Sequence, residues 1–247
     1  RLLKKGEPSG GGTFTEAPAD RPDLEELVAK TVAAEDAARA TRHAESMTRF
    51  AADCAAAGTV NPGVLFGQAS PMTRVMPRDA FEAKPATNLA VRLARNEKEA
   101  IQLLIAPTAA DLKDVKVAVS ALTRDRPWWR FWEGDVLLAA SNVAAQVMGY
   151  CEMKVATDYS YVSTARTASN TLERVRSAPH LGWYPEPILD FLDTIEIVKG
   201  DVQSFWLNVR CPEDQPAGIY RGNLVVTYKI QTAQSVQTSV TLPFTVR

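Results

Sequence analysis

The sequence has almost no net charge and no long apolar run. Its 28 basic and 29 acidic side chains leave a formal net charge of -1. It therefore lacks the basic face with which proteins follow a phosphate backbone, and we expect no nucleic-acid partner. It also lacks a stretch of about 18 apolar residues, so we expect no membrane span.

Cysteine and histidine are scarce. The three cysteines, Cys54, Cys151 and Cys211, are far apart, as are the two histidines, His43 and His180. Without a Cys-x-x-Cys pair or a Cys/His cluster, the sequence predicts no metal site, redox motif or cofactor. We interpret all three thiols as small buried apolar groups and favour this over a disulfide between two of them.

The chain begins with Arg1 instead of methionine, and it lacks the apolar stretch and cleavage site of a secretory signal. We interpret both ends as cuts within a longer polypeptide, with any signal sequence upstream.

Composition divides the chain into three parts. Residues 1–22 combine Gly10-Gly-Gly12 with several prolines, which is typical of a linker. Residues 23–58 are rich in alanine, and their apolar residues recur at helical spacing up to the natural stop at Gly58. This pattern predicts one amphipathic helix, or two joined near Thr41. Its narrow apolar stripe would allow close packing on a partner surface.

Residues 59–247 change to a period of two. About ten short runs with almost no helical pattern between them predict an antiparallel β-sandwich, immunoglobulin-like or jelly-roll-like, behind the N-terminal helix. A polar stretch over 156–177 is expected to be a long loop with a helical turn at most. The predicted strands are Val64–Phe66, Thr73–Met76, Leu89–Arg95, Ala100–Ala106, Val115–Leu122, Val136–Ala140, Val143–Met153, Ile195–Val198, Ser204–Arg210, Ile219–Ile230 and Val236–Val246.

A turn signature follows the strand predicted over Ser204–Arg210. Pro212 cannot donate to a strand ladder and ends that strand, while Pro216 and Gly218 favour a tight turn. Tyr220 is then expected to face inward, where sandwich folds often anchor a tyrosine hydroxyl.

Two further segments accompany this turn. Arg95-Asn-Glu97 and Glu99 lead into Ile101-Gln-Leu103, and Trp183-Tyr-Pro-Glu-Pro-Ile-Leu189 precedes a Gly-Asp-x-Gln-x-x-Trp pattern that ends at Trp206. In order and spacing, the three segments resemble the N-terminal β-sandwich domain of glycoside hydrolase family 123 and its uncharacterised bacterial relatives. The resemblance extends from about residue 70 to residue 247.

The resemblance implies a multidomain protein whose chemistry lies in a C-terminal barrel, with an adjacent Asp-Glu pair and the substrate acetamido group acting together. No Asp is followed directly by Glu in this chain, so no catalytic residue is assigned and the fragment is expected not to be an enzyme. The implied substrates are N-acetylhexosamine glycans, and the implied location is extracytoplasmic, either periplasmic or secreted. The implied partner is the barrel of the same polypeptide.

Two aromatic segments are candidate interaction sites. Pro127-Trp-Trp-Arg-Phe-Trp132 places Trp128, Trp129 and Trp132 among arginines. We favour packing of these rings onto the sheet, with domain docking and sugar stacking as alternatives. Trp183 and Tyr184 lie in a segment with two prolines, which predicts either a rigid crossover or a docking loop.

Three functional hypotheses remain open. The first is a non-catalytic accessory domain that supports an absent catalytic barrel. The second is an independent carbohydrate-binding or cell-surface adhesion module, which requires an exposed aromatic platform. The third is a spacer that self-associates through residues 23–57.

Overall fold

The structure is a computed structural model that describes residues 22–59, 61–130, 132, 134–153, 182–231 and 236–247. Residues 1–21, the loop predicted over 156–177 and His180 lie outside this set. The chain separates into two compact units, Arg1–Ala38 and Arg39–Arg247, so the boundary falls inside the N-terminal helix. Each unit is described by itself.

Helix α1 spans Pro22–Ala56 as one continuous helix. Residues 24–57 contain neither glycine nor proline, the two residues that most disfavour a helix interior. Gly58 ends the helix with a φ of 68°, and its N–H donates to the carbonyl of Ala55 at 3.1 Å. Among the described residues, no helix has the apolar length needed to cross a membrane.

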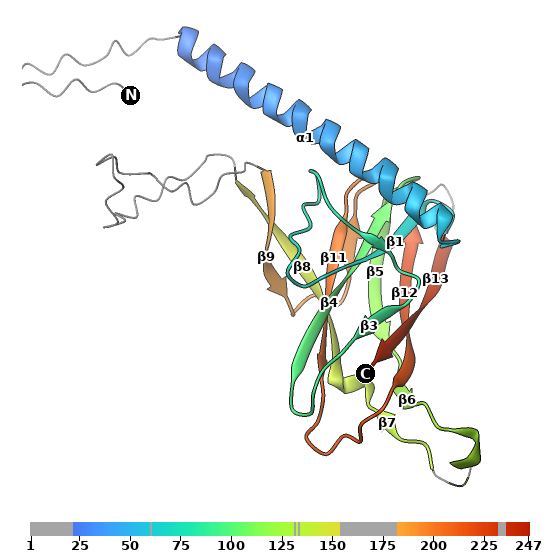
Figure 1. Cartoon of the computed structure of the whole chain (residues 1–247). Coiled ribbons are helices and arrows are strands. Elements are labelled where there is room, and N and C mark those ends of the chain that lie inside the picture. The colour runs from blue at the N-terminus through green and yellow to red at the C-terminus, as the bar shows by residue number, and fades with distance from the viewer. Residues whose placement is uncertain (1–21, 60, 131, 133, 154–181, 232–235) are drawn as a thin grey trace, which may run out of the picture. The chain divides into compact units, whose positions relative to one another are not determined.

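Two sheets form the rest of the described fold (Figure 1). The first sheet has the order β2-β1-β4-β11-β8-β9, and all of its neighbouring strands are antiparallel. Its strands are β2 (Lys84–Pro85), β1 (Val64–Ala69), β4 (Lys98–Pro107), β11 (Gln203–Arg210), β8 (Val143–Met153) and β9 (Gly182–Leu189).

The second sheet has the order β10-β5-β12-β13-β3, and β6 pairs with both β12 and β7. Its strands are β10 (Ile195–Ile197), β5 (Leu112–Val119), β12 (Tyr220–Ile230), β13 (Val236–Val246), β3 (Leu89–Val91), β6 (Leu122–Arg124) and β7 (Leu137–Leu138). Strand β13 pairs with β12 over eleven residues, whereas β3 joins β13 in parallel only at residues 244–246. The prediction of a β-sandwich is therefore confirmed, with one parallel strand pair.

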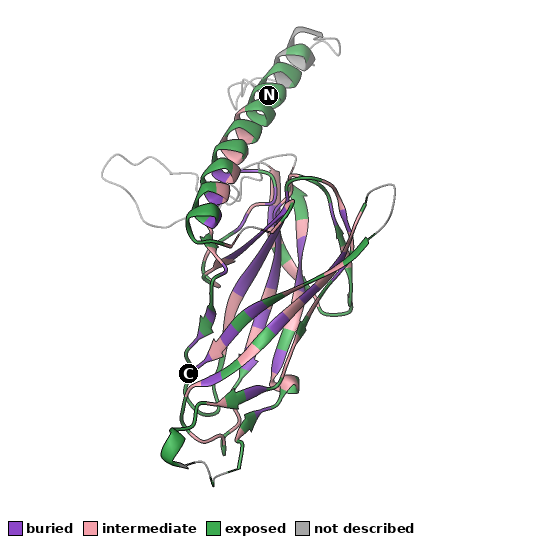
Figure 2. Cartoon of the chain, turned by 90° about the vertical axis from the view of Figure 1, so that its right-hand side faces the viewer, coloured by how far each residue is buried: buried purple, intermediate pink, exposed green. Residues whose placement is uncertain are grey.

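The main core lies between the sheets, where alternate residues of each strand point inward (Figure 2). Leu103 and Ile105 of β4 and Leu207 of β11 are fully buried, as are Leu224 and Val226 of β12. Across the core, the ring of Phe66 lies 6.4 Å from the ring of Tyr228.

A smaller core covers the outer face of the first sheet. Phe50 and Cys54 from the second half of α1 are buried there against Leu65 of β1 and Leu104 of β4. The loop between β1 and β2 closes this second core with Val75 and Phe81. The second half of β4, from Gln102 to Pro107, is thus buried on both faces, which explains why Gln102 is its only polar residue.

Gly67 of β1 makes the close approach of the helix possible. A Cβ on Gly67 would lie 2.7 Å from Cζ of Phe50, inside van der Waals contact. Any larger residue would push the Phe50 ring away, so Gly67 sets the distance between helix and sheet. The sequence left open what α1 packs on; from Arg42 to Cys54 it packs on the sandwich itself.

Polar contacts hold the same part of the helix. Arg42 donates to both carboxylate oxygens of Asp79, at 2.8 and 3.0 Å, and the Asp79 side chain is 5% exposed. The two ring nitrogens of His43 lie 3.0 Å from the carbonyl of Asp79 and 2.6 Å from that of Gly200. Adjacent residues of the helix therefore bind two loops that are distant in sequence.

Two predicted local structures are wrong. Thr73–Met76 lies in the loop that closes the second core and forms no strand. Trp183–Leu189, predicted as a loop or crossover, lies within β9 and pairs with β8. Proline is tolerated there because β9 is an edge strand, where one side of the backbone needs no ladder partner.

Candidate functional site

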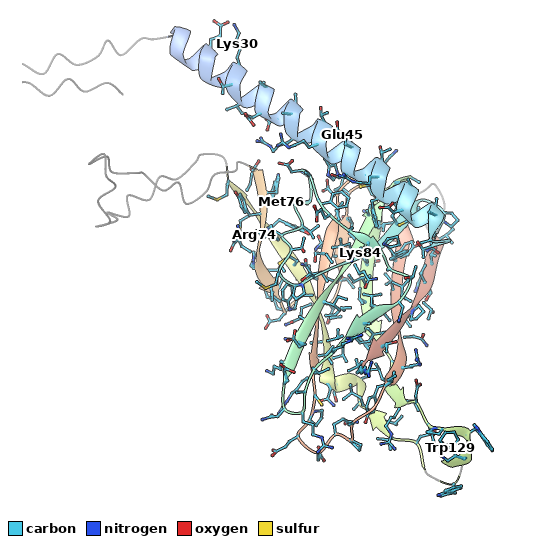
Figure 3. The ribbon with its side chains drawn as sticks, in the orientation of Figure 1. Lys30, Glu45, Arg74, Met76, Lys84 and Trp129 are labelled. Carbon is cyan, nitrogen blue, oxygen red and sulfur yellow. The ribbon has the colours of Figure 1, made fainter. Side chains whose placement is uncertain are left out.

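Trp128, Trp129 and Trp132 lie in the hairpin connection between β6 and β7, with residues Trp128–Arg130 in a short 3-10 helix. The side chains are exposed: Trp128 by 82%, Trp129 by 55% and Trp132 by 69%. Figure 3 shows Trp129 at this hairpin, away from the two sheets. The expectation that these rings pack onto the sheet is therefore wrong, because the hairpin carries them beyond the sheet edge.

Hydrogen bonds and ion pairs hold the base of this hairpin, residues 124–126 and 135–137. Arg221 of β12 donates from Nε to both oxygens of Asp125, at 3.0 and 2.8 Å. Gln215 donates to the carbonyl of Leu137 at 3.2 Å, and Arg126 lies 3.8 Å from Asp135. The exposed tryptophans thus sit on a hairpin base whose acidic residues, Asp125 and Asp135, already have arginine partners.

A cavity of about 560 Å³ opens beside the hairpin base. Its walls include Leu93, Leu138, Ile219 and Val246, so its lining is mainly apolar. Tyr220 closes one side, and its hydroxyl donates to the carbonyl of Pro216 at 2.5 Å. The prediction that Tyr220 faces inward with an anchored hydroxyl is confirmed.

Two of the three sequence signatures meet at this cavity. The backbone N–H of Asn96 donates to the carbonyl of Cys211, and the N–H of Cys211 donates to that of Glu97, both at 3.0 Å. Asn96 has a φ of 61°, which asparagine adopts more readily than most residues. Residues 95–97 and 212–222 therefore form one end of the sandwich.

The other aromatic candidates lie far from the hairpin. Trp183 pairs with Glu152 near the end of β8, whereas the hairpin leads into the start of β8 at Val143. At about 3.3 Å per residue, that separation along β8 is about 30 Å. Tyr184 is buried in the first sheet, and Trp183 is half-buried. The structure thus places Trp128, Trp129 and Trp132 on one hairpin and leaves Trp183 and Tyr184 at another site.

The surroundings of Trp183 form a shallow cleft of about 250 Å³. The guanidinium of Arg78 lies 5.4 Å from the centre of the Trp183 ring and binds both carboxylate oxygens of Asp201 at 2.8 Å. Hydrogen bonding to Asp201 raises the pKa of Arg78 above its usual value, although burial opposes the shift. One face of the ring is therefore already occupied by a paired cation.

Acidic residues near this cleft do not converge. Asp190, Asp193 and Glu196 are all exposed, and Glu196 lies 3.8 Å from Lys113. Among the residues that the structure describes, no three His, Cys, Asp or Glu side chains are grouped to hold a metal ion.

The three thiols occupy three environments. Cys54 is buried, Cys211 is partly exposed at the cavity, and Cys151 is exposed on β8. The expectation of three buried thiols is wrong for Cys151 and Cys211, and all three are free in the structure.

A buried polar network was not anticipated from the sequence. Gln102 donates to the carbonyls of Ser70 and Thr73, both at 2.7 Å, and accepts from the Ser204 hydroxyl at 2.7 Å. Tyr150 donates to the carbonyl of Val202 at 3.2 Å and accepts from the N–H of Ser204 at 3.0 Å. Burial raises the pKa of Tyr150 far above its usual value, so the hydroxyl remains neutral.

This network gives the glutamine of the Ile101-Gln-Leu103 signature a structural role, because it attaches the loop between β1 and β2 to the first sheet. The one sign of this network in the sequence is a polar residue, Gln102, among apolar neighbours in a predicted strand. Its partners lie in a loop with no periodic pattern, so the sequence did not identify them.

No family model matches the sequence, and no curated protein matches it. Among solved structures, a family 123 glycoside hydrolase from Clostridium perfringens superimposes with a TM-score of 0.52 at 14% identity. The match covers 74% of this chain but 27% of that one, so this chain spans about a quarter of the enzyme's length. At this identity the likeness shows a shared fold.

Two other β domains match less well. PapD-like domain 7 of human CEP192 has a TM-score of 0.33 at 9% identity, covering 72% of this chain and 91% of that one. The Escherichia coli CFA/I adhesin CfaE has a TM-score of 0.31 at 7% identity, covering 74% of this chain and 48% of that one.

Proposed function

We propose that this chain is the non-catalytic β-sandwich accessory domain of a multidomain glycoside hydrolase that resembles family 123. One observation carries the proposal: the fold matches that of a family 123 enzyme over 74% of this chain and only 27% of the enzyme. The three sequence signatures, in the order found in the family, add support. In this role the domain packs against a catalytic barrel, stabilises it and forms one wall of the substrate cleft.

The chemistry belongs to the barrel in this proposal. The acidic pair that the family resemblance requires, Asp followed by Glu, is absent from these 247 residues. The proposed substrates of the whole protein are N-acetylhexosamine glycans of galacto configuration, and its proposed location is extracytoplasmic.

Hydrolysis of a nitrophenyl N-acetylgalactosaminide tests this function. We expect residues 1–247 to release nitrophenol no faster than buffer, and a longer polypeptide that runs on past Arg247 to hydrolyse it. We also expect deletion of the sandwich from the longer polypeptide to lower the midpoint of its thermal unfolding. Hydrolysis by residues 1–247 alone would contradict the non-catalytic role.

An independent carbohydrate-binding module is the second candidate, and the exposure of Trp128, Trp129 and Trp132 favours it specifically. Flat, exposed indole rings can stack on the apolar face of a sugar. Isothermal titration with N-acetylated and plain oligosaccharides distinguishes the two candidates. Binding that Trp128→Ala or Trp132→Ala abolishes would support the module, and no heat with any sugar would support the accessory role.

A further inference from the structure

We propose that the domain following Arg247 docks on one end of the sandwich, made of the tryptophan hairpin (residues 124–130, 132 and 134–137) and the adjacent cavity. This inference rests on the proposed accessory function, since it names the surface through which that function operates. The occupant is a folded domain of the same polypeptide, with an apolar surface that receives the indole rings.

The first argument is the exposed apolar area. Trp128, Trp129 and Trp132 are each more than half exposed, and Leu137 at the hairpin base is 52% exposed. A fully exposed tryptophan can bury roughly 150–250 Å², so these three partly exposed rings supply about half of the about 800 Å² that each partner contributes to a standard interface. The neighbouring cavity of about 560 Å³ adds an apolar depression for a partner side chain.

The second argument is the position of Arg247. Its N–H donates to the carbonyl of Val91 at 2.9 Å, and its carbonyl accepts from the N–H of Leu93 at 3.0 Å. Arg247 also lines the cavity, together with Leu138 of the hairpin base. Figure 1 places the C-terminus and strands β6 and β7 toward the same end of the sandwich. A domain joined here is held beside this surface at an effective concentration that its linker sets.

The third argument is charge. Asp125 is paired with Arg221 and Asp135 with Arg126, so these acidic side chains already have basic partners within the surface. Arg95 and Arg247 also line the cavity, so its rim can bind carboxylate or carbonyl groups of a partner surface. An apolar protein surface with a polar rim fits this arrangement, since tryptophan and arginine are enriched at such interfaces.

A second group of exposed apolar residues on the sandwich makes a weaker candidate. Ile188, Phe191 and Val198 lie on or beside the β9 edge, and the neighbouring Trp183 ring already carries Arg78 on one face. None of them lies at the cavity that Arg247 lines.

Two of the thiols provide a direct test, because Cys211 lines the proposed surface and Cys151 lies on β8 opposite Tyr184. Each is kept as the single exposed thiol by replacing the other with alanine. Its rate of modification by N-ethylmaleimide is then measured in residues 1–247 and in the longer polypeptide. We expect Cys211 to react at least about tenfold more slowly in the longer polypeptide. A tenfold change corresponds to a free energy of about 1.4 kcal/mol for exposing the thiol. We expect Cys151 to react at an unchanged rate.

Hydrogen–deuterium exchange provides a second measurement that needs no substitution. Peptides covering residues 122–138 and 212–220 should exchange more slowly in the longer polypeptide, while peptides covering β9 should not change. In that polypeptide, Trp128→Ala combined with Trp129→Ala should restore fast Cys211 modification. The matched control Phe191→Ala also removes an exposed ring, 76% exposed, and should leave the protection intact.

The outcomes separate the two proposals. Protection of β9 and Cys151 in place of the hairpin would overturn the docking surface and leave the accessory function standing. A longer polypeptide with no protected segment, or a stop codon directly after Arg247, would overturn the accessory function itself. Protection of the hairpin in residues 1–247 by added N-acetylgalactosamine or chitotetraose would also overturn the docking surface, in favour of a glycan site.

Discussion

Replacement of Phe50 by alanine tests how the second half of α1 is held on the sandwich. Phe50 is 2% exposed, its ring lies over Gly67, and it meets Phe81 edge-to-face with ring centres 5.9 Å apart. Phe-to-Ala replacements in a core cost about 3–5 kcal/mol. Gly67 has no side chain to fill the space left behind, so we expect little relaxation and a cost within this range.

Cys54, one helical turn after Phe50, reports on detachment of the helix. Burial raises the pKa of its thiol, and the side chain is inaccessible while the helix is docked. In a chain with Cys151 and Cys211 replaced by alanine, modification by N-ethylmaleimide therefore requires opening. When closing is fast, the rate follows the opening equilibrium, so a loss of about 3 kcal/mol should raise it by roughly a hundredfold.

The matched control is Phe191→Ala, which removes the same ring from a position that is 76% exposed. Surface substitutions usually change stability by about 0.5 kcal/mol or less, which is about twofold in rate. If Phe50→Ala reacts no faster than this control, Cys54 is protected by something other than packing of α1, and the account of the second core is wrong.

Two further predictions concern buried polar groups. Gln102→Leu leaves the Ser204 hydroxyl and two loop carbonyls without their hydrogen-bond partner. It should lower the free energy of unfolding, measured in urea, by about 1–3 kcal/mol. Gln68→Leu, at a half-buried position, should cost less, and equal costs would count against the network. Burial raises the pKa of Tyr228 above the usual value of about 10, so its contribution to stability is complete below that pH and is lost as pH rises through the folded-state pKa. Between about pH 8 and pH 11, the Tyr228→Phe variant should therefore lose less of its free energy of unfolding than the parent protein. Equal losses would contradict a raised pKa for Tyr228.

Periodicity predicted the parts of the fold that depend on local pattern. The alternation from Val236 to Val246 matches the bounds of β13, and the helical spacing of Phe50 and Cys54 marks the two apolar residues that α1 buries in the second core. In both cases a regular repeat places apolar side chains on one face, and burying that face is what stabilises the element.

Features that depend on tertiary position were not predicted. Two prolines in Trp183–Leu189 argue against a strand unless the segment lies at an edge, and edge position is a property of the assembled sheet. The tryptophans of the hairpin were expected to be buried because large apolar clusters usually are. A hairpin long enough to lift them off the sheet leaves no local signature. The partners of Phe50, on β1 and β4, become visible only once the sheet is formed.

The pairing of β13 has a mechanical consequence. An axial pull on Arg247 drags β13 lengthwise past β12, to which it is joined along eleven residue pairs, and past β3 at its last three residues. Sliding of this kind loads many inter-strand hydrogen bonds at once, whereas peeling would break them one after another. Tension applied at Arg247 along β13 therefore loads the sandwich in shear.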